Sequence, residues 1–245
     1  MVSREQKNPA PAVALVDALI LCGGLGTRLT PVVPDRPKGL ATVSGRPFLD
    51  LLTSELVREE FRRLILCVGH RGDQIIDHFR GRDDAQFVFS VEDRPLGTGG
   101  AVRLALPRVT NAPFVVVNGD SFCRVRYAEL LAFHQRKAAL ATMVVTPPTE
   151  RVDVGAVELA ADQRLLSFNE KPAQIDARRQ LVNAGIYVIE PRLIESVPEN
   201  LPCSLEREIL PRAIDERSCY AFRVDGPLVD IGTPERYEAA QSLLR

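Results

Sequence analysis

The segment Leu21-Cys22-Gly23-Gly24-Leu25-Gly26-Thr27-Arg28-Leu29 combines three glycines with an arginine, and Pro37-Lys38 follows within ten residues. An apolar run from Val13 to Leu21 precedes it and predicts a buried strand that ends in a glycine-rich turn. Glycines let the backbone approach an anion closely and turn N–H groups inward, because they have no Cβ and accept positive φ angles. Arg28 and Lys38 add charge that amides lack. The spacing therefore predicts a phosphate-binding loop.

This loop differs from two common nucleotide-binding motifs. No lysine follows its last glycine directly, as one does in P-loop proteins, and its glycines lack the G-x-G-x-x-G spacing of dinucleotide-binding folds. An ordinary tight turn is the alternative for the glycines alone. The arginine and the Pro37-Lys38 pair favour the phosphate-binding interpretation.

Three further polar segments are predicted to follow strands, and open α/β sheets bind ligands beyond the carboxyl ends of their strands. They are Glu92-Asp93-Arg94-Pro95-Leu96-Gly97-Thr98-Gly99-Gly100, Asn118-Gly119-Asp120 and Val229-Asp230-Ile231-Gly232-Thr233. Asp120 and Asp230 in such positions suit Mg²⁺, which takes a few hard oxygen ligands and keeps places for phosphate oxygens and water. The alternative is that each aspartate caps the next turn or helix.

The elements that position these residues alternate between strands and helices. Continuous β-rich runs at 64–68 and 114–117 are typical of strands buried on both faces of a parallel sheet. Apolar residues recur at helical spacing in 48–60, 74–79, 98–106 and 127–137. This order predicts right-handed βαβ crossovers and an α/β fold with a Rossmann-like, doubly wound, mostly parallel sheet.

The second half of the chain is richer in strands. We expect strands at 141–146, 154–159, 181–189 and 220–224, and helices at 205–214 and 234–244. Thr233-Pro234-Glu235 is a good helix start, with threonine as N-cap and proline at N1. We expect residues 1–11 to form a flexible tail and residues 12–245 to form a single domain, because no internal repeat or low-complexity linker divides them.

The composition restricts the classes of partner. The 31 basic residues balance 32 acidic ones, which gives a formal charge of -1, and 45% of the 245 residues are hydrophobic. This balance indicates no nucleic-acid partner and no electrostatic membrane anchor, and no apolar run is long enough to span a bilayer. We expect small-molecule substrates, and the sequence leaves homo-oligomerisation open.

The cysteine pattern argues against a zinc site or a disulfide framework, because the five cysteines are scattered and form no C-x-x-C pair. Cys22 and Cys67 lie in apolar runs and predict buried, reduced thiols and a cytoplasmic protein. The run at 12–21 imitates a secretory signal, but Asp17 interrupts it and no small-residue cleavage site follows. The three histidines, to which we assign no catalytic role, are His70, His78 and His134.

Taken together, the motifs resemble those of the sugar-1-phosphate nucleotidylyltransferases. They run in the family's order through residues 21–235: G-G-x-G-T-R-L with Pro37-Lys38, Pro95-Leu96-Gly97-Thr98-Gly99-Gly100, Asn118-Gly119-Asp120, Glu170-Lys171-Pro172, Asn183-Ala184-Gly185-Ile186-Tyr187 and Asp230-Ile231-Gly232-Thr233-Pro234-Glu235. The resemblance implies a nucleotidyltransferase catalytic domain of the nucleotide-diphospho-sugar transferase type, with a strand-rich sugar-binding extension. Family members that carry a C-terminal left-handed β-helix are longer.

The resemblance also implies a reaction and roles. A sugar 1-phosphate oxygen would attack the α-phosphorus of a nucleoside triphosphate in line, and pyrophosphate would leave, without a covalent enzyme intermediate. By the family pattern, Arg28 would stabilise the triphosphate and the leaving pyrophosphate, and Lys38 would contact phosphates near the reacting centre. Asp120 and Asp230 would hold Mg²⁺, and Lys171 would bind the phosphate of the sugar.

Other positions would contact the nucleotide or the sugar. The residues assigned to the nucleotide are Leu21, Gly23, Gly24, Gly26, Thr27, Glu92, Gly97 and Thr98. Glu170, Asn183 and the backbone at Gly155 would face sugar hydroxyls. The alternatives are surface cations for Arg28 and Lys38, a solvated pair for Glu170 and Lys171, and a turn residue for Asn183.

Glu92 carries the prediction about the base. Family members that use thymidine or uridine triphosphates commonly have glutamine near this point, which offers both a donor and an acceptor. An ionised glutamate only accepts, which suits the N1–H and N2–H₂ donors of guanine and leaves O6 for a backbone N–H near Gly97. Guanine is therefore preferred, with an exposed strand-end glutamate as the alternative.

Within the guanylyl-transferring members, four segments most resemble those of bacterial D-glycero-α-D-manno-heptose 1-phosphate guanylyltransferases, which supply GDP-heptose for capsule or other surface polysaccharide. They are Val33-Pro34-Asp35-Arg36-Pro37-Lys38, Pro47-Phe48-Leu49, Pro95-Leu96-Gly97-Thr98-Gly99-Gly100 and Ser204-Leu205-Glu206-Arg207-Glu208-Ile209-Leu210-Pro211. Cys22 and Gly39 depart from the family's usual residues. Mannose 1-phosphate, a uridylyl or thymidylyl transfer to a hexose 1-phosphate, and an idle nucleotide-sugar sensor remain as alternatives.

Overall fold

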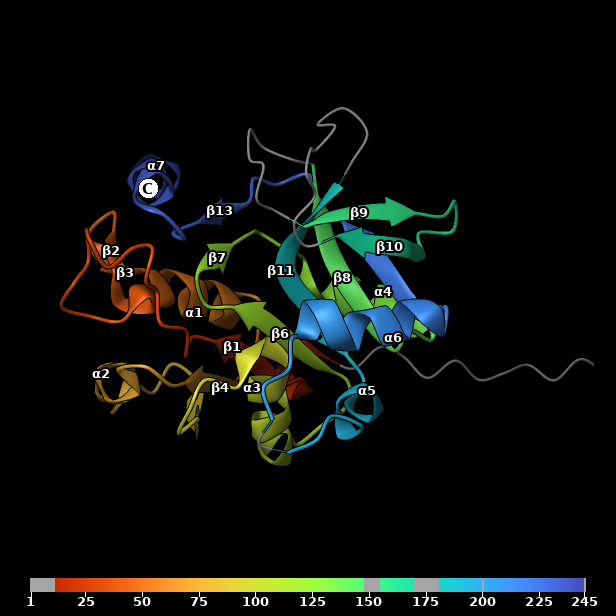
Figure 1. Ribbon diagram of the computed structural model, residues 1–245, viewed down its shortest axis with the longest axis horizontal. Coiled ribbons are helices and arrows are strands. Elements are labelled where there is room, and N and C mark those ends of the chain that lie inside the picture. The colour runs from red at the N-terminus through yellow and green to blue at the C-terminus, as the bar shows by residue number, and fades with distance from the viewer. Residues whose placement is uncertain (1–11, 148–154, 170–180, 200, 245) are drawn as a thin grey trace, which may run out of the picture.

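A mixed sheet forms the centre of the computed structural model, which describes residues 12–147, 155–169, 181–199 and 201–244 (Figure 1). Its main path runs β10-β9-β11-β6-β1-β4-β5, with β8 beside β11 and β12 beside β8. The strands are β1 (Ala18–Leu21), β4 (Arg63–Val68), β5 (Gln86–Val91), β6 (Phe114–Asn118), β8 (Ala141–Thr146), β9 (Ala156–Leu159), β10 (Leu165–Asn169), β11 (Leu181–Ile189) and β12 (Cys219–Arg223).

Most strands of this sheet share one direction. β1 pairs in parallel with β4 and β6, and β4 pairs in parallel with β5. β11 is antiparallel to β6, β8 and β9, so these three strands run in the same direction. β12 is parallel to β8 and therefore runs in that direction too. Of these described strands only β10 and β11 run the other way. The structure confirms the predicted α/β fold with a large, mostly parallel sheet in a single domain.

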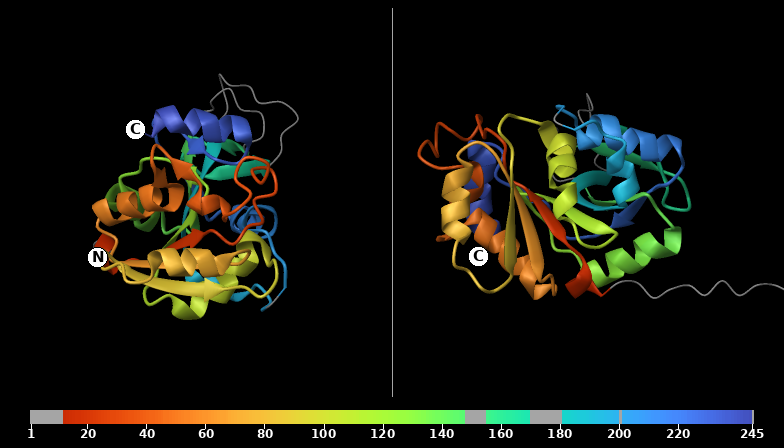
Figure 2. Two further views of the ribbon diagram at one scale, coloured as in Figure 1. Left: turned by 90° about the vertical axis from the view of Figure 1, so that its left-hand side faces the viewer. Right: turned by 90° about the horizontal axis from the view of Figure 1, so that it is seen from below.

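Helices cover both faces of the sheet, because alternate residues of its buried strands point to opposite sides. Val115 and Val117 of β6 join one core cluster, and Phe114 and Val116 join the other. The first cluster includes buried residues of α1 (Phe48–Arg58), α2 (Gly72–Phe79), α4 (Tyr127–Lys137) and α7 (Pro234–Leu243). The second includes α3 (Gly97–Ala105), α5 (Pro191–Glu195) and α6 (Leu210–Asp215). The right-hand view of Figure 2 shows α1 and α2 on one side of the parallel strands and α3 and α6 on the other.

The first strand and one helix differ from the sequence prediction. β1 begins at Ala18, after a short 3-10 helix at Val13–Leu15. The buried Asp17 lies between that turn and β1, and its Oδ2 accepts hydrogen bonds from the Thr110 N–H and hydroxyl. The helix predicted over 205–214 is a π-helical turn, Leu205–Ile209, followed by α6. Pro211 offers no N–H to a regular α-helical ladder there, which is a physical reason for the change.

Short elements complete the fold. β10 and two short strand pairs were not predicted: β2 (Thr42–Val43) with β3 (Arg46–Pro47), and β7 (Ser121–Phe122) with β13 (Val229–Asp230). Two more 3-10 helices occur at Lys38–Leu40 and Leu106–Arg108. Within the described ranges, no helix has the length and apolar content needed to cross a bilayer. All five cysteines are free thiols.

Candidate active site

A cavity of about 530 Å³ lies where the carboxyl ends of β1, β4, β5 and β6 meet. This is the edge at which a parallel sheet presents its loops to a ligand. Nine of the predicted active-site residues line this cavity in the described part of the chain. They are Leu21, Gly23, Gly24, Gly26, Lys38, Glu92, Gly97, Thr98 and Asp120. The sheet therefore brings the glycine loop together with Asp120, which follows Gly26 by more than ninety positions.

Backbone hydrogen bonds hold the glycine loop at the strand ends. The Cys22 N–H donates to the Cys67 carbonyl at 3.0 Å, and the His70 N–H donates to the Gly23 carbonyl at 3.1 Å. Gly26 has a φ of +63°, and a Cβ on it would lie 3.1 Å from the Lys38 Cβ. A side chain at Gly26 would therefore be both strained and crowded.

Glu92 forms one wall of the cavity. Its Oε2 accepts a hydrogen bond from the Leu96 N–H at 3.2 Å. A Cβ at Gly23 would lie 3.0 Å from the Gly69 backbone nitrogen, and one at Gly69 would lie 2.9 Å from the Gly23 carbonyl oxygen and 2.5 Å from Glu92 Oε1, so both positions favour glycine. Burial raises the pKa of the Glu92 carboxyl, and the Leu96 hydrogen bond opposes that shift only in part.

Lys38 and Asp120 meet across the cavity. Lys38 Nζ lies 2.5 Å from Asp120 Oδ2, and the Ser121 hydroxyl donates to Asp120 Oδ1 at 3.1 Å. Burial raises the pKa of Asp120, but the charge and hydrogen bond of Lys38, with the Ser121 bond, outweigh it and leave the pKa below its usual value. The Asp120 side chain is still 40% exposed, so it is accessible to a ligand.

Asp230 reaches Asp120 through the β7–β13 pair. Asp230 is the register partner of Ser121, and the Ile231 N–H donates to the Asp120 carbonyl at 3.0 Å. Asp230 Oδ1 accepts hydrogen bonds from the Gly232 N–H at 2.8 Å and from Arg236 Nη1 at 3.2 Å. The two predicted magnesium ligands therefore lie at the same end of this strand pair, Asp230 on β13 and Asp120 directly before β7, although Asp230 itself does not line the cavity.

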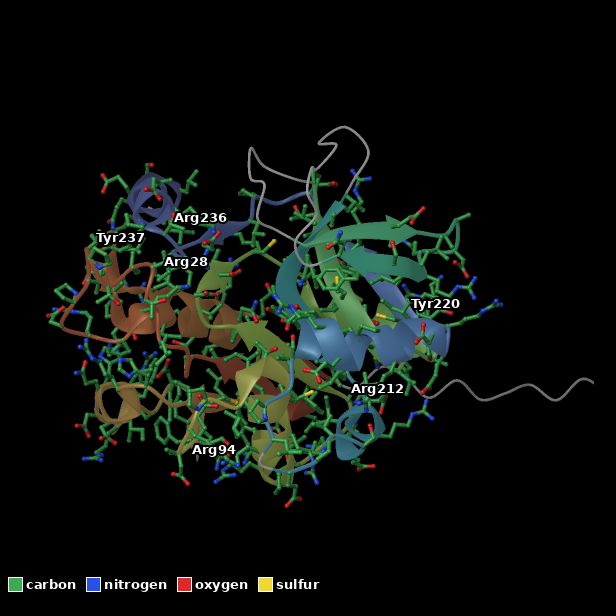
Figure 3. All side chains as sticks on the ribbon, in the orientation of Figure 1. Arg28, Arg94, Arg212, Tyr220, Arg236 and Tyr237 are labelled. Atoms are coloured by element: carbon green, nitrogen blue, oxygen red, sulfur yellow. The ribbon has the colours of Figure 1, made fainter. Side chains whose placement is uncertain are left out.

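Arg28 lies with this second carboxylate. A Cβ at Gly232 would lie 2.8 Å from Asp230 Oδ1, 3.2 Å from Arg236 Nη1 and 3.6 Å from Arg28 Nη2. Figure 3 shows the labelled Arg28 and Arg236 on the same side of the molecule, near β13. Neither Thr27 nor Arg28 lines the cavity, so in this structure Arg28 belongs to the Asp230 group and not to the loop lining.

The candidate sugar-binding residues are placed in part. Glu170 and Lys171 lie outside the described residues. The Asn183 N–H donates to the Gly155 carbonyl at 2.9 Å, so these two positions are adjacent. Gly185 has a φ of +72°, and a Cβ on it would lie 2.7 Å from Asn118 Nδ2. Because Asn118 lines the cavity, this part of β11 borders the candidate nucleotide site.

The sequence analysis gave no role to one residue of the site, and the structure shows the contacts of two others that depart from the family's usual residues. His70 lines the cavity although it was given no role, and it follows a buried strand as the predicted motifs do, which was a usable signal. Gly39 packs on Leu49, since a Cβ there would lie 2.6 Å from Leu49 Cδ1. Cys22 donates its thiol hydrogen to the Cys67 carbonyl, and burial raises its pKa well above the usual value.

Comparison with known proteins identifies the family of this chain. A family model described as Nucleotidyl transferase matches residues 17–245. The chain belongs to this family. The family predicted from the motifs is therefore confirmed.

Relatives of this chain include two kinds of guanylyltransferase. Mannose-1-phosphate guanyltransferase 2 of Candida glabrata is 32% identical over 92% of this chain and 63% of its own length, so the chain spans less than two thirds of that relative. D-glycero-alpha-D-manno-heptose 1-phosphate guanylyltransferase of Aneurinibacillus thermoaerophilus is 30% identical over 94% of this chain and 99% of its own length.

Two solved structures show the same fold. HddC from Yersinia pseudotuberculosis, complexed with GMP-PN, is 30% identical over 94% of this chain and all of its own, with a TM-score of 0.80. A putative glucose-1-phosphate thymidylyltransferase from Bacillus anthracis has a TM-score of 0.84 over 94% of this chain and 95% of its own. Its 18% identity supports the fold alone.

Proposed function

We propose that this chain is a sugar-1-phosphate guanylyltransferase that transfers GMP from GTP to a sugar 1-phosphate and releases pyrophosphate. The observation that carries the proposal is the Glu92 carboxylate in the wall of a cavity that also contains the glycine loop, Lys38 and Asp120. The cavity has the size of a small-molecule site. Its polar groups suit a base at one end and phosphates at the other.

The argument for guanine rests on hydrogen-bond direction. Glu92 Oε2 already accepts from the Leu96 N–H, which holds the carboxylate in place. An ionised carboxylate has only acceptors, and guanine presents adjacent N–H donors at N1 and N2. The complex of the Yersinia HddC with GMP-PN and the names of both groups of relatives support the same nucleotide.

The argument for phosphoryl transfer rests on charge. The attacking sugar phosphate oxygen forms a bond to the α-phosphorus while the bond to the β-phosphate oxygen breaks, and pyrophosphate leaves with that electron pair. Lys38 lies against Asp120 in this structure and has a flexible stem, so incoming phosphates can draw its ammonium group toward them. The loop amides would hold the phosphates, and Arg28 would meet pyrophosphate from the Asp230 side.

Asp120 and Asp230 fit a Mg²⁺ site by their chemistry and their position. Asp230 lies on β13 and Asp120 directly precedes its partner strand β7, and in the structure each carboxylate faces a cation, Arg236 or Lys38. Among the described residues no cluster of three or more such ligands exists, and Mg²⁺ bound with substrate needs only one or two carboxylates. When bound, the ion would neutralise charge on the phosphate oxygens.

For the sugar, we propose D-glycero-α-D-manno-heptose 1-phosphate, in the synthesis of a nucleotide sugar for surface polysaccharide. The Aneurinibacillus relative supports this, because this chain spans nearly its full length. Mannose 1-phosphate is the second candidate, since the mannose-specific relatives are equally similar in sequence and the two sugars share the manno ring configuration.

The deciding experiment is a panel assay of pyrophosphate release in the presence of Mg²⁺. GTP, UTP, dTTP, CTP and ATP are each combined with heptose, mannose and glucose 1-phosphates. We expect GTP with a manno-configured sugar to give the highest kcat/KM. A preference for UTP or dTTP would replace the proposal with a uridylyl or thymidylyl transfer, and no turnover with any pair would favour a nucleotide-sugar sensor.

A further inference from the structure

Glu206 is a buried carboxylate outside the proposed catalytic groups, and it accepts three hydrogen bonds from side chains. The Thr98 hydroxyl donates to its Oε2 at 2.6 Å, and the Ser204 hydroxyl donates to the same oxygen at 3.2 Å. The Tyr187 hydroxyl donates to Oε1 at 3.2 Å. Glu206 belongs to the π-helical turn Leu205–Ile209, and such turns occur frequently at functional sites.

The partners of Glu206 lead in two directions. Thr98 lies in the first turn of α3 and lines the candidate nucleotide cavity. Tyr187 lies on β11, and its hydroxyl accepts a hydrogen bond from Asn183 Nδ2 at 2.6 Å. Asn183 is a candidate sugar-binding residue. One carboxylate therefore joins the nucleotide side of the site to its sugar side.

In the structure Glu206 accepts each of its side-chain hydrogen bonds, and this sets the direction of the bonds that continue from its partners. The Tyr187 hydroxyl donates to Glu206, and its oxygen accepts from Asn183 Nδ2. The carboxamide of Asn183 is then held in one orientation, with its Oδ1 accepting from the Gly185 N–H at 2.9 Å.

The same rule fixes Thr98 on the nucleotide side. Its hydroxyl donates to Glu206 and accepts from the Leu205 N–H at 2.8 Å. The start of α3 is also held by the Cys203 carbonyl, which accepts from the N–H groups of Gly99 at 2.9 Å and Gly100 at 3.2 Å. The segment before Glu206 thus holds the start of α3 in place. Glu206 itself determines the direction in which the Thr98 hydroxyl donates its hydrogen.

We propose that Glu206 is a positioning residue for both substrates: it orients Thr98 toward the nucleotide and, through Tyr187, orients Asn183 toward the sugar. This inference rests on the proposed function, because it assumes that the cavity holds GTP and that Asn183 meets the sugar. Glu206 contacts neither substrate. Its charge acts through the direction that it imposes on the two hydroxyls.

The test compares Glu206→Gln with the matched variant Glu208→Gln. Glu208 lies exposed on the same helical turn and accepts from the Ser204 N–H at 2.8 Å, without contacting Thr98 or Tyr187. Glutamine keeps the size of glutamate but brings an N–H₂ donor to the hydroxyls, which disturbs the direction of the network. We expect Glu206→Gln to raise the KM of GTP and of the sugar 1-phosphate about tenfold, and Glu208→Gln to leave both unchanged.

Variants that remove one partner of Glu206 at a time, called single-arm variants, separate its effect on the nucleotide from its effect on the sugar. Thr98→Val should raise mainly the KM of GTP, and Tyr187→Phe should raise mainly the KM of the sugar 1-phosphate. Each change should have little further effect in the Glu206→Gln background, because coupled residues are not additive. If Glu206→Gln fails to fold, the two single-arm variants carry the test by themselves.

Three outcomes are distinguishable. No turnover by the unaltered protein with any substrate pair would overturn the proposed function. With an active unaltered protein, a Glu206→Gln variant that melts at a lower temperature but keeps both KM values within about twofold would show a purely structural role. Single-arm variants that leave both KM values unchanged would overturn the positioning role as well.

Discussion

Opposite charges that face one another are the main feature of the site at the scale of single residues. Lys38 lies against Asp120, and Arg236 donates to Asp230. Lys38 helps to hold the pKa of Asp120 below its usual value, because an opposite charge within hydrogen-bond distance favours the charged form. The substrates bring phosphate charge that can take over the cations, and the carboxylates are then available to a divalent ion.

Asp120→Asn should reduce turnover about a thousandfold, because an amide keeps the shape of the side chain but loses the charge that would hold Mg²⁺. The fold should survive, since the Asp120 side chain is 40% exposed. Pyrophosphate release and a thermal melt would measure the two effects. Asp73→Asn, an exposed change on α2 outside the cavity, is the control. Undiminished turnover by Asp120→Asn would contradict the metal assignment.

Glu92 should make GTP use depend on pH. Burial raises its pKa, so as pH falls Glu92 takes up a proton at a higher pH than an exposed glutamate does. The protonated form donates where guanine also donates, so the KM of GTP should rise as pH falls through that range. Glu92→Gln should show a weaker GTP preference at every pH and no such titration.

The comparison with Glu92→Gln also cancels the titration of the substrate phosphates, because both proteins meet the same substrates. The measurement is the ratio of the two GTP KM values across mildly acidic pH. A ratio that does not change with pH, together with an unchanged GTP preference in the variant, would show that Glu92 does not contact the base.

At the scale of elements, the glycines of the segment 97–100 serve packing as much as ligand binding. Cβ atoms at Gly97 and Gly99 would lie 2.6 Å and 3.1 Å from the Cys203 carbonyl oxygen, and one at Gly100 would lie 2.9 Å from the Leu201 carbonyl oxygen. The start of α3 therefore lies directly on the segment that leads into the π-helical turn. This close approach brings Thr98 within reach of Glu206.

Gly97→Ala should destabilise the protein by about 3 kcal/mol, which combines the cost of a positive φ with the backbone collision. Gly81→Ala is the matched control, because Gly81 also has a positive φ, +81°, but no atom within 4 Å of the added Cβ. We expect about 1 kcal/mol for the control. Urea denaturation of both variants measures the difference, and equal losses would show that the collision is relieved without cost.

At the scale of the whole molecule, the end of the chain returns to the segment after the phosphate loop. The Tyr237 hydroxyl and Gln241 Nε2 of α7 both donate to the Thr42 carbonyl, at 2.7 and 3.0 Å. Figure 1 shows α7 beside the β2–β3 hairpin. Asp230, which precedes α7, is thereby fixed relative to Lys38. The β6–β11 pair joins the two halves of the chain in one sheet.

The protein should therefore unfold in one cooperative transition. A continuous sheet gives neither half an independent core, so both halves should lose structure together. Scanning calorimetry tests this through the ratio of calorimetric to van't Hoff enthalpy, which should be close to one. Two resolved transitions, or a ratio well above one, would show that residues 12–245 contain more than one folding unit.

Sequence patterns alone were enough to predict the fold class, the family and the main segments that line the cavity. These depend on local signals: apolar runs that form buried strands, glycines that permit tight turns, and the rule that ligands meet the carboxyl ends of parallel strands. Gly23, Lys38, Glu92 and Asp120 could be found because each lies in or just after such a turn or strand end.

The contacts between distant side chains could not be predicted from sequence patterns. Lys38 and Asp120 are 82 positions apart, and Thr98 and Glu206 are 108 apart, so strand order and helix packing set these contacts. Strand order and helix packing also place Arg28 beside Asp230. They likewise produce the hydrogen-bond network that connects Asn183 with Thr98 through Tyr187 and Glu206. A local pattern carries no record of long-range pairing, because many arrangements of the same elements satisfy it equally well.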